Sequence, residues 1–110
     1  MADKPPLDLK DMQQAATRAC SLLKVLGNPD RLMLLCQLTQ GEYRVGELES
    51  LLGIVQPTLS QQLGVLREER LVSTRREGKQ IFYKIDSPEA LAVMEVLYQQ
   101  FCLSTEGVET

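Results

Sequence analysis

The chain has 110 residues, of which 44% are hydrophobic, and it carries a formal net charge of −3. This length and composition predict one globular domain rather than a disordered tail, and no apolar run approaches the ~18 residues that span a membrane. The N-terminal stretch lacks the apolar segment of a signal peptide, so we expect a cytoplasmic protein without a membrane partner.

Several classes of active site are excluded by residues that the chain lacks. It contains no histidine, which rules out a histidine general base, a Ser-His-Asp triad and an imidazole metal site. It also lacks a glycine motif that cradles phosphates. The three cysteines, Cys20, Cys36 and Cys102, are too few for a disulfide scaffold and are expected to be reduced thiols. We therefore expect no enzyme, no catalytic residue and no cofactor.

The charge is distributed unevenly along the chain. Residues 1–55 carry six basic and seven acidic side chains (−1), residues 56–85 carry six basic and three acidic (+3), and residues 86–110 carry five acidic and none basic (−5). The positive charge of residues 56–85 is what a nucleic-acid contact needs, although the chain as a whole is acidic.

The predicted elements are mainly helices. Hydrophobic spacing, caps and turn residues predict, in chain order, a flexible arm over 1–10, helices over about 11–26, 28–40, 45–52 and 56–69, strands over 71–76 and 80–85 joined at 77–79, a helix from 87 to about 103, and a flexible tail over 104–110. Four helices, a hairpin and a last helix form the outline of a winged helix-turn-helix domain over residues 11–103, a mainly α fold with a β-hairpin wing.

The helix that begins near residue 56 has two different faces. Leu59, Leu63 and Leu66 recur at helical spacing and are predicted to pack into the core. In helix-turn-helix proteins the start of the second helix contacts base edges, and glutamine can form two hydrogen bonds with adenine. We therefore expect double-stranded DNA to be contacted by the polar start of this helix and by one basic residue near its end, namely Gln56, Pro57, Thr58, Ser60, Gln61 and Arg67.

The predicted hairpin carries basic residues where a wing would cross the phosphates. Arg75, Arg76 and Lys79 are the residues expected to contact the DNA backbone there. The pattern alone leaves an alternative open, in which a solvated amphipathic helix simply lies beside a surface hairpin.

Two long segments carry a resemblance to a known family. "LKVLGNPDRLMLLCQL" and "VGELESLLGIVQPTLSQQLGVLREERLVSTRREGKQIFYKI", together with the last helix, resemble the ArsR/SmtB family of dimeric bacterial repressors over residues 15–103. The resemblance implies a homodimer held by the first and last helices, which binds an imperfect palindrome in operator DNA. Many members sense metals through a Cys-Val-Cys motif, but the corresponding residues are Arg44-Val45-Gly46, so the resemblance implies no metal site.

The cysteines are similar to those of the persulfide-sensing branch of this family. Cys36 on the second helix and Cys102 on the last helix, with VGELE in place of the metal motif, match that branch. The match implies that an organic persulfide or another reactive sulfur species links Cys36 to Cys102 through one or more added sulfur atoms. The linked protein would then release the operator DNA of genes for sulfide detoxification. Cys20 is expected to be a small buried hydrophobic residue.

Some alternatives stay open at this point. The same scaffold fits an anti-silencing activator of virulence genes, because the sign of control depends on the position of the operator. A protein-interaction module with a degenerate DNA face is a further alternative, and the salt dependence of DNA binding would separate it from a regulator. The sequence does not identify what activates the attacking thiol, since Cys102 lies near a helix C-terminus, where the helix dipole disfavours a thiolate.

Overall fold

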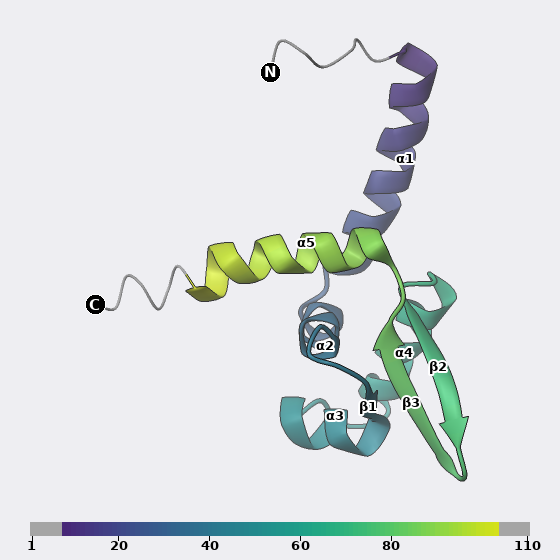
Figure 1. Cartoon of the computed structure of the whole chain (residues 1–110), viewed down its shortest axis with the longest axis vertical. Helices are drawn as coiled ribbons and strands as arrows, with labels where there is room; N and C mark the ends of the chain where they lie inside the picture. The colour runs from purple at the N-terminus through teal and green to yellow at the C-terminus, as the bar shows by residue number, and fades with distance from the viewer. Residues whose placement is uncertain (1–7, 104–110) are drawn as a thin grey trace.

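The computed structural model describes residues 8–103, which form a small helical body with a hairpin wing (Figure 1). The elements in chain order are α1 (Leu9–Leu26), α2 (Pro29–Leu38), β1 (Tyr43–Arg44), α3 (Val45–Leu52), α4 (Thr58–Glu68), β2 (Val72–Glu77), β3 (Gln80–Ile85), α5 (Pro88–Tyr98) and the π-helical turn η1 (Gln99–Leu103). This order confirms the predicted mainly α fold with a β-hairpin wing. The predicted tail over 104–110 and the first seven residues of the predicted arm lie outside the described residues.

Helix boundaries differ from the prediction where a cap decides them. Helix α1 begins two residues earlier than expected, because the side chain of Asp8 accepts hydrogen bonds from the main-chain N–H groups of Lys10 and Asp11. Helix α2 ends at Leu38. The main-chain N–H of the next residue, Thr39, donates to the carbonyls of Leu35 and Cys36 in the last turn. Pro57, expected inside the first turn of α4, is the residue that precedes the helix.

The short strand β1 was missed by the sequence prediction. It pairs antiparallel with β3, so that Tyr43 faces Tyr83 and Arg44 faces Phe82. The resulting sheet has the order β1-β3-β2, with the wing hairpin formed by β2 and β3. Gly78 begins the two-residue turn of the hairpin at φ 64°, a conformation that glycine adopts without steric penalty.

The core lies among α2, α3 and α4, with contributions from the wing and α5. Six leucines are fully buried there, namely Leu34, Leu35, Leu48, Leu59, Leu63 and Leu66. The predicted core face of α4 is therefore confirmed. Because this face fixes α4 against the body, the opposite face is presented to solvent.

Helices α1 and α5 project from the body in different directions (Figure 1). Helix α1 buries only Val25 and Leu26, while Leu9 and Leu23 are 67% and 59% exposed. Much of the apolar surface of this helix is therefore uncovered in the single chain. The far end of α5 likewise exposes Val96, and no helix in residues 8–103 has the length and apolar character to cross a membrane.

Candidate DNA-binding surface and cysteine pocket

A tight turn joins α3 to α4. Gly53 ends α3 at φ 71°, in the left-handed region that favours glycine, and its N–H donates to the carbonyl of Glu49 at 2.9 Å. The buried side chain of Ile54 then anchors the turn to the core. These contacts hold the start of α4 at the surface.

The start of α4 presents the polar side chains expected from the sequence. Ser60, Gln61 and Arg67 are exposed, and Thr58 is half-buried. Gln56 is exposed as well, but its Oε1 accepts a hydrogen bond from the N–H of Ser60 at 3.0 Å. This side chain therefore caps α4 with one lone pair of Oε1, a role that the sequence prediction did not give it.

A clamp between α2 and α4 was missed by the sequence prediction. Nη1 of Arg31 donates to Oε1 of Gln62 at 2.8 Å, and Nε of Arg31 donates to the carbonyl of Val25 at 2.7 Å. The main-chain N–H of Arg31 also donates to the cap residue Asn28. The NPDR stretch indicated only a helix start, because the bond to Gln62 depends on packing between residues 31 positions apart.

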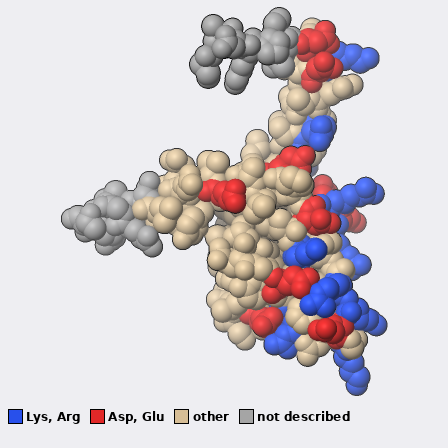
Figure 2. Space-filling model, viewed as in Figure 1, with Lys and Arg blue, Asp and Glu red and all other residues tan. Residues whose placement is uncertain are grey.

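The wing holds its basic residues in two different ways. Arg75, Arg76 and Lys79 are all exposed, but Arg75 also pairs with Glu42 at 2.9 Å and lies 4.4 Å above the ring centre of Phe82. Figure 2 shows basic side chains, mixed with acidic ones, along the edge of the molecule that the wing forms. The guanidinium of Arg75 is therefore partly engaged by Glu42 and Phe82.

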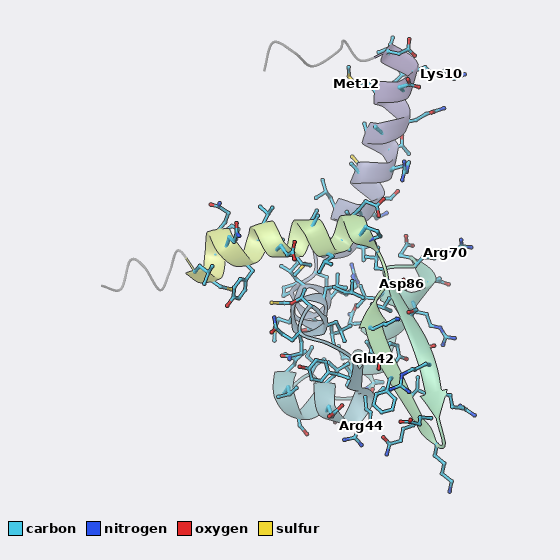
Figure 3. The ribbon with its side chains drawn as sticks, viewed as in Figure 1. Lys10, Met12, Glu42, Arg44, Arg70 and Asp86 are labelled. Carbon is cyan, nitrogen blue, oxygen red and sulfur yellow. The ribbon has the colours of Figure 1, made fainter. Side chains whose placement is uncertain are left out.

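Arg44 connects α3 with the wing. Its Nη1 donates to Oε1 of Gln80 at 3.1 Å, and its main-chain N–H donates to Oε1 of Glu47 at 2.8 Å. The main-chain N–H of Arg44 lowers the pKa of Glu47, since it stabilises the carboxylate. In Figure 3, Glu42 and Arg44 both lie between α3 and the hairpin. The sequence singled out Arg44 only as a position without a metal-binding thiol, and no signal pointed to this contact.

Two of the three cysteines line one pocket between α2 and α5–η1. Its volume is about 400 Å³, and its walls expose only nonpolar and sulfur atoms. The lining includes Cys36 and Met33 from α2, Leu97 from α5, and Cys102 from η1. Two residues 66 positions apart are therefore brought to the same cavity by the packing of the helices.

The pocket disfavours the charged form of Cys36. This residue is half-buried, and its pKa is raised above the ordinary value, mainly by burial and additionally by the neighbouring Cys102. The neutral thiol is therefore favoured at pH 7. An attacking thiolate at Cys36 must form against this environment, which does not activate it.

Cys20 lies apart from this pocket. It is on α1 and is exposed, which contradicts the expectation of a small buried residue, because α1 becomes buried against the body only further along the chain, at Val25 and Leu26. Within residues 8–103, no group of three or more cysteine, aspartate or glutamate side chains has an arrangement that could hold a metal ion.

Comparison with known proteins identifies the family. Residues 28–74 match the family described as "Bacterial regulatory protein, arsR family". Over 108 residues the chain is 53% identical to the biofilm growth-associated repressor of Agrobacterium fabrum, and the match covers 94% of this chain and 92% of that protein. This chain belongs to the ArsR family. ArsR-family membership confirms the resemblance found in the sequence and the prediction of a transcriptional regulator rather than an enzyme.

Solved structures of ArsR-family regulators share the fold. The crystal structure of the transcriptional repressor BigR from Xylella fastidiosa has a TM-score of 0.80 at 52% identity, covering 87% of this chain and 98% of that chain. Reduced HlyU from Vibrio cholerae has a TM-score of 0.81 at 41% identity, covering 86% of this chain and 99% of that chain. A transcriptional activator of this name from the same species is 40% identical over 101 residues, covering 92% of this chain and 94% of that protein.

Proposed function

We propose that this ArsR-family regulator is a dimeric repressor, which binds operator DNA in the reduced state and releases it when Cys36 and Cys102 are linked. The observation that carries the proposal is the shared pocket: thiols from α2 and from η1 line one cavity of about 400 Å³. The similarity to the repressors of Agrobacterium fabrum and Xylella fastidiosa supports repression rather than activation of transcription.

The proposed DNA surface consists of α4 and the wing. Exposed polar side chains at the start of α4 can bond base edges in the major groove, as this helix does in other helix-turn-helix proteins. The exposed Arg76 and Lys79 supply charge for phosphate contacts, with Arg75 as a third, partly paired cation. Base-reading roles are proposed for Ser60 and Gln61 above all.

A homodimer through α1 and α5 is part of the proposal. Both helices leave large apolar side chains uncovered, with Leu23 59% and Val96 55% exposed. A monomer gains nothing from such faces, whereas a second copy would bury them and place two α4 helices against two half-sites of an imperfect palindrome.

The proposed signal is a covalent link between two helices. The thiolate of one cysteine attacks the outer sulfur of an organic persulfide, R–S–SH, and expels RS⁻, so that a Cys–S–SH persulfide forms, and a second R–S–SH lengthens it in the same way to Cys–S–S–SH. The thiolate of the other cysteine then attacks the sulfur bonded to the first cysteine sulfur and expels HS⁻, which leaves one added sulfur between Cys36 and Cys102. The persulfides are the oxidant, and two RSH molecules and H₂S are the reduced products. Each added sulfur relaxes the requirement that the two Cα atoms lie within about 7 Å for a direct disulfide. A ~100-fold release of DNA needs about 2.7 kcal/mol of coupling, which is within the usual allosteric range.

Three single variants test the proposal. Cys36→Ser and Cys102→Ser should bind operator DNA like the parent protein but should fail to release it after treatment with glutathione persulfide, because a link needs both thiols. Cys20→Ser is the matched control and should both bind and release. Release of DNA from the Cys36→Ser protein by the persulfide would refute the sensing pair.

A second candidate function is favoured by one relative. The similarity to the transcriptional activator HlyU supports an anti-silencing activator on the same scaffold, with the same DNA surface. Transcription from the native promoter with and without the regulator separates the two, since a repressor lowers the transcript and an anti-silencing activator raises it. A DNA affinity that is insensitive to salt would instead point to a protein-interaction module.

A further inference from the structure

Gly64 lies in the middle of α4, on the same face as the polar side chains that are proposed to read bases. It follows Ser60 by four positions and Gln61 by three, and it precedes Arg67 by three, so helical spacing places these residues around it. All four residues are exposed. The centre of this polar face therefore carries no side chain.

The fold gives no reason for a glycine at this position. The φ of Gly64 is not positive, and an added Cβ would have no atom within 4 Å outside the neighbouring turns of α4. Glycine in a helix interior is less favourable than alanine, because it loses more conformational freedom on folding. Gly64 therefore weakens α4 without relieving strain or a clash within residues 8–103. A second glycine with open space around it, Gly46, lies in the first turn of α3 and not in a helix interior.

The neighbours of Gly64 fix α4 against the body. Leu63 and Leu66 are buried in the core, and Gln62 accepts a hydrogen bond from Arg31 at 2.8 Å. The helix cannot roll or move back without breaking these contacts. A partner that approaches the polar face therefore meets the main chain of α4 at a fixed position, and a side chain at residue 64 would stand between the two.

The surface around Gly64 is hollowed and carries a free cation. An open hollow there is lined by Gln61, Gly64, Val65, Arg67 and Glu68. Arg67 forms no ion pair within residues 8–103, so its guanidinium is available to a phosphate. The acidic Glu68 is the last residue of α4, whereas in helix-turn-helix proteins the start of this helix contacts the base edges. Charge and shape therefore favour a DNA strand as the occupant.

We propose that Gly64 is a point of close approach, at which the main chain of α4 lies in van der Waals contact with operator DNA. The missing side chain lets α4 lie deep enough in the major groove for Ser60 and Gln61 to reach base edges. The inference rests on the proposed function, in which α4 enters the groove. It adds a DNA contact that is made by a residue without a side chain.

Two uncharged substitutions at Gly64 separate DNA binding from folding. Gly64→Ala adds one methyl group and Gly64→Gln adds a longer side chain, and both residues favour a helix more than glycine does. Both variants should therefore unfold at a higher urea concentration than the parent protein, at one protein concentration. The reduced, full-length proteins are titrated with a duplex that spans the operator of the native promoter. Gly64→Gln should weaken operator binding at least ~10-fold, or about 1.4 kcal/mol, and Gly64→Ala by a smaller factor.

Ser50→Gln is the matched control, because Ser50 is exposed on α3, outside the proposed DNA surface. It should bind the operator like the parent protein. Equal losses of affinity in Ser50→Gln and Gly64→Gln would overturn the close approach, as would a Gly64→Gln protein that binds as tightly as the parent. A lower urea midpoint in both Gly64 variants would also overturn it, since the glycine would then serve folding.

The same titrations distinguish this inference from the proposed function. A parent protein that binds the duplex and releases it after treatment with glutathione persulfide, beside a Gly64→Gln protein that binds equally well, would contradict the close approach alone. A parent protein that does not bind the duplex would contradict both.

Discussion

Arg31 of α2 holds Gln62 of α4 by a hydrogen bond of 2.8 Å between Nη1 and Oε1. The same guanidinium donates through Nε to the carbonyl of Val25 at 2.7 Å, so one side chain joins α1, α2 and α4. Helix α2 also carries Cys36, five positions further along. If the proposed link between Cys36 and Cys102 shifts α2, the shift would therefore act on α4 through these hydrogen bonds of Arg31.

Substitutions of the two adjacent glutamines on α4 should affect different properties, namely stability for Gln62 and DNA binding for Gln61. Gln62→Ala removes one hydrogen-bond partner of the half-buried guanidinium of Arg31, which keeps its bond to the carbonyl of Val25, so we expect the free energy of unfolding to fall by about 1–2 kcal/mol. Gln61→Ala, on the exposed face, should leave stability unchanged but weaken operator binding by about 1–3 kcal/mol if this side chain reads one base. Urea unfolding at one protein concentration and titration of operator DNA at one salt concentration measure both effects.

Ser60→Ala extends this test to a second proposed base contact. It should weaken operator binding by a similar amount without affecting folding, because the capping bond from Gln56 uses the main-chain N–H of residue 60 and not its hydroxyl. Unchanged operator affinity in both the Ser60 and the Gln61 variants would contradict base reading by α4.

Three basic residues of the wing test its proposed contacts with the DNA phosphates. Arg76→Gln and Lys79→Gln should weaken binding to all DNA sequences alike and reduce the salt slope by up to about 0.9 for each phosphate that the variant no longer neutralises. Arg75→Gln should do the same and also lower stability by roughly 0.5–1 kcal/mol, since it removes the contacts with Glu42 and Phe82. A sequence-selective weakening of binding would mean that the wing reads bases.

The sequence predicts features that depend on local pattern and misses those that depend on packing. Leu59, Leu63 and Leu66 repeat at helical spacing, so the buried face of α4, and with it the exposed polar face, follows from the chain alone. Strand β1 has two residues and no period to detect. The contact of Glu42 with Arg75 could therefore not be predicted from the sequence, because the two residues are 33 positions apart and meet only in the folded sheet.

The cysteines illustrate the same limit. The resemblance to a family indicated that Cys36 and Cys102 belong together, but only the packing of α2 against α5–η1 gives them a shared nonpolar pocket. Cys20 was expected to be buried because burial is the commonest state of a free cysteine. It is exposed because α1 packs on the body only at its end, through Val25 and Leu26, and a helical period does not show whether an apolar face is covered within the same chain.

Leu23 tests the proposed dimer interface. Leu23→Glu places a charge on the uncovered face of α1, so it should convert the dimer to a monomer while each chain stays folded, because the side chain has little contact with the core. Sedimentation velocity and circular dichroism measure the two properties. Leu51→Glu, at a similarly exposed position of α3, should remain dimeric, and an equal shift in both variants would contradict an interface on α1.

Arg70, two residues after the end of α4, has a backbone conformation that favours glycine. Its φ is 63°. The N–H of Arg70 donates to the carbonyl of Arg67 at 3.0 Å, and the N–H of Leu71 donates to the carbonyl of Leu66 at 2.9 Å. Arg70→Gly should be more stable than Arg70→Ala by about 1 kcal/mol, because both remove the charge but only glycine removes the backbone strain. Gly53→Ala, at φ 71° with open space around its Cα, should lower stability by a similar amount in urea unfolding.

The pH dependence of Cys36 gives a last test of the pocket. Because burial, and secondarily Cys102, raises the pKa of Cys36, the rate of its alkylation by iodoacetamide should rise with pH and reach its midpoint above the ~8.5 of a free cysteine. In a Cys102→Ser background the midpoint should fall only part of the way, since burial is the larger cause. Peptide mass spectrometry isolates the signal of Cys36 from that of Cys20.

The raised pKa of Cys36 also predicts a change in stability with a definite sign. Below the pKa of the unfolded chain the thiol of Cys36 is protonated in both states, and its contribution to stability is fully present. As the pH rises through the folded pKa, the unfolded chain has already given up its proton and is favoured, so this contribution disappears at alkaline pH. Cys36→Ser should show a smaller alkaline decrease in stability than the parent protein in urea unfolding. A larger decrease in the serine variant, or an alkylation midpoint below ~8.5, would mean that the pocket stabilises the thiolate instead.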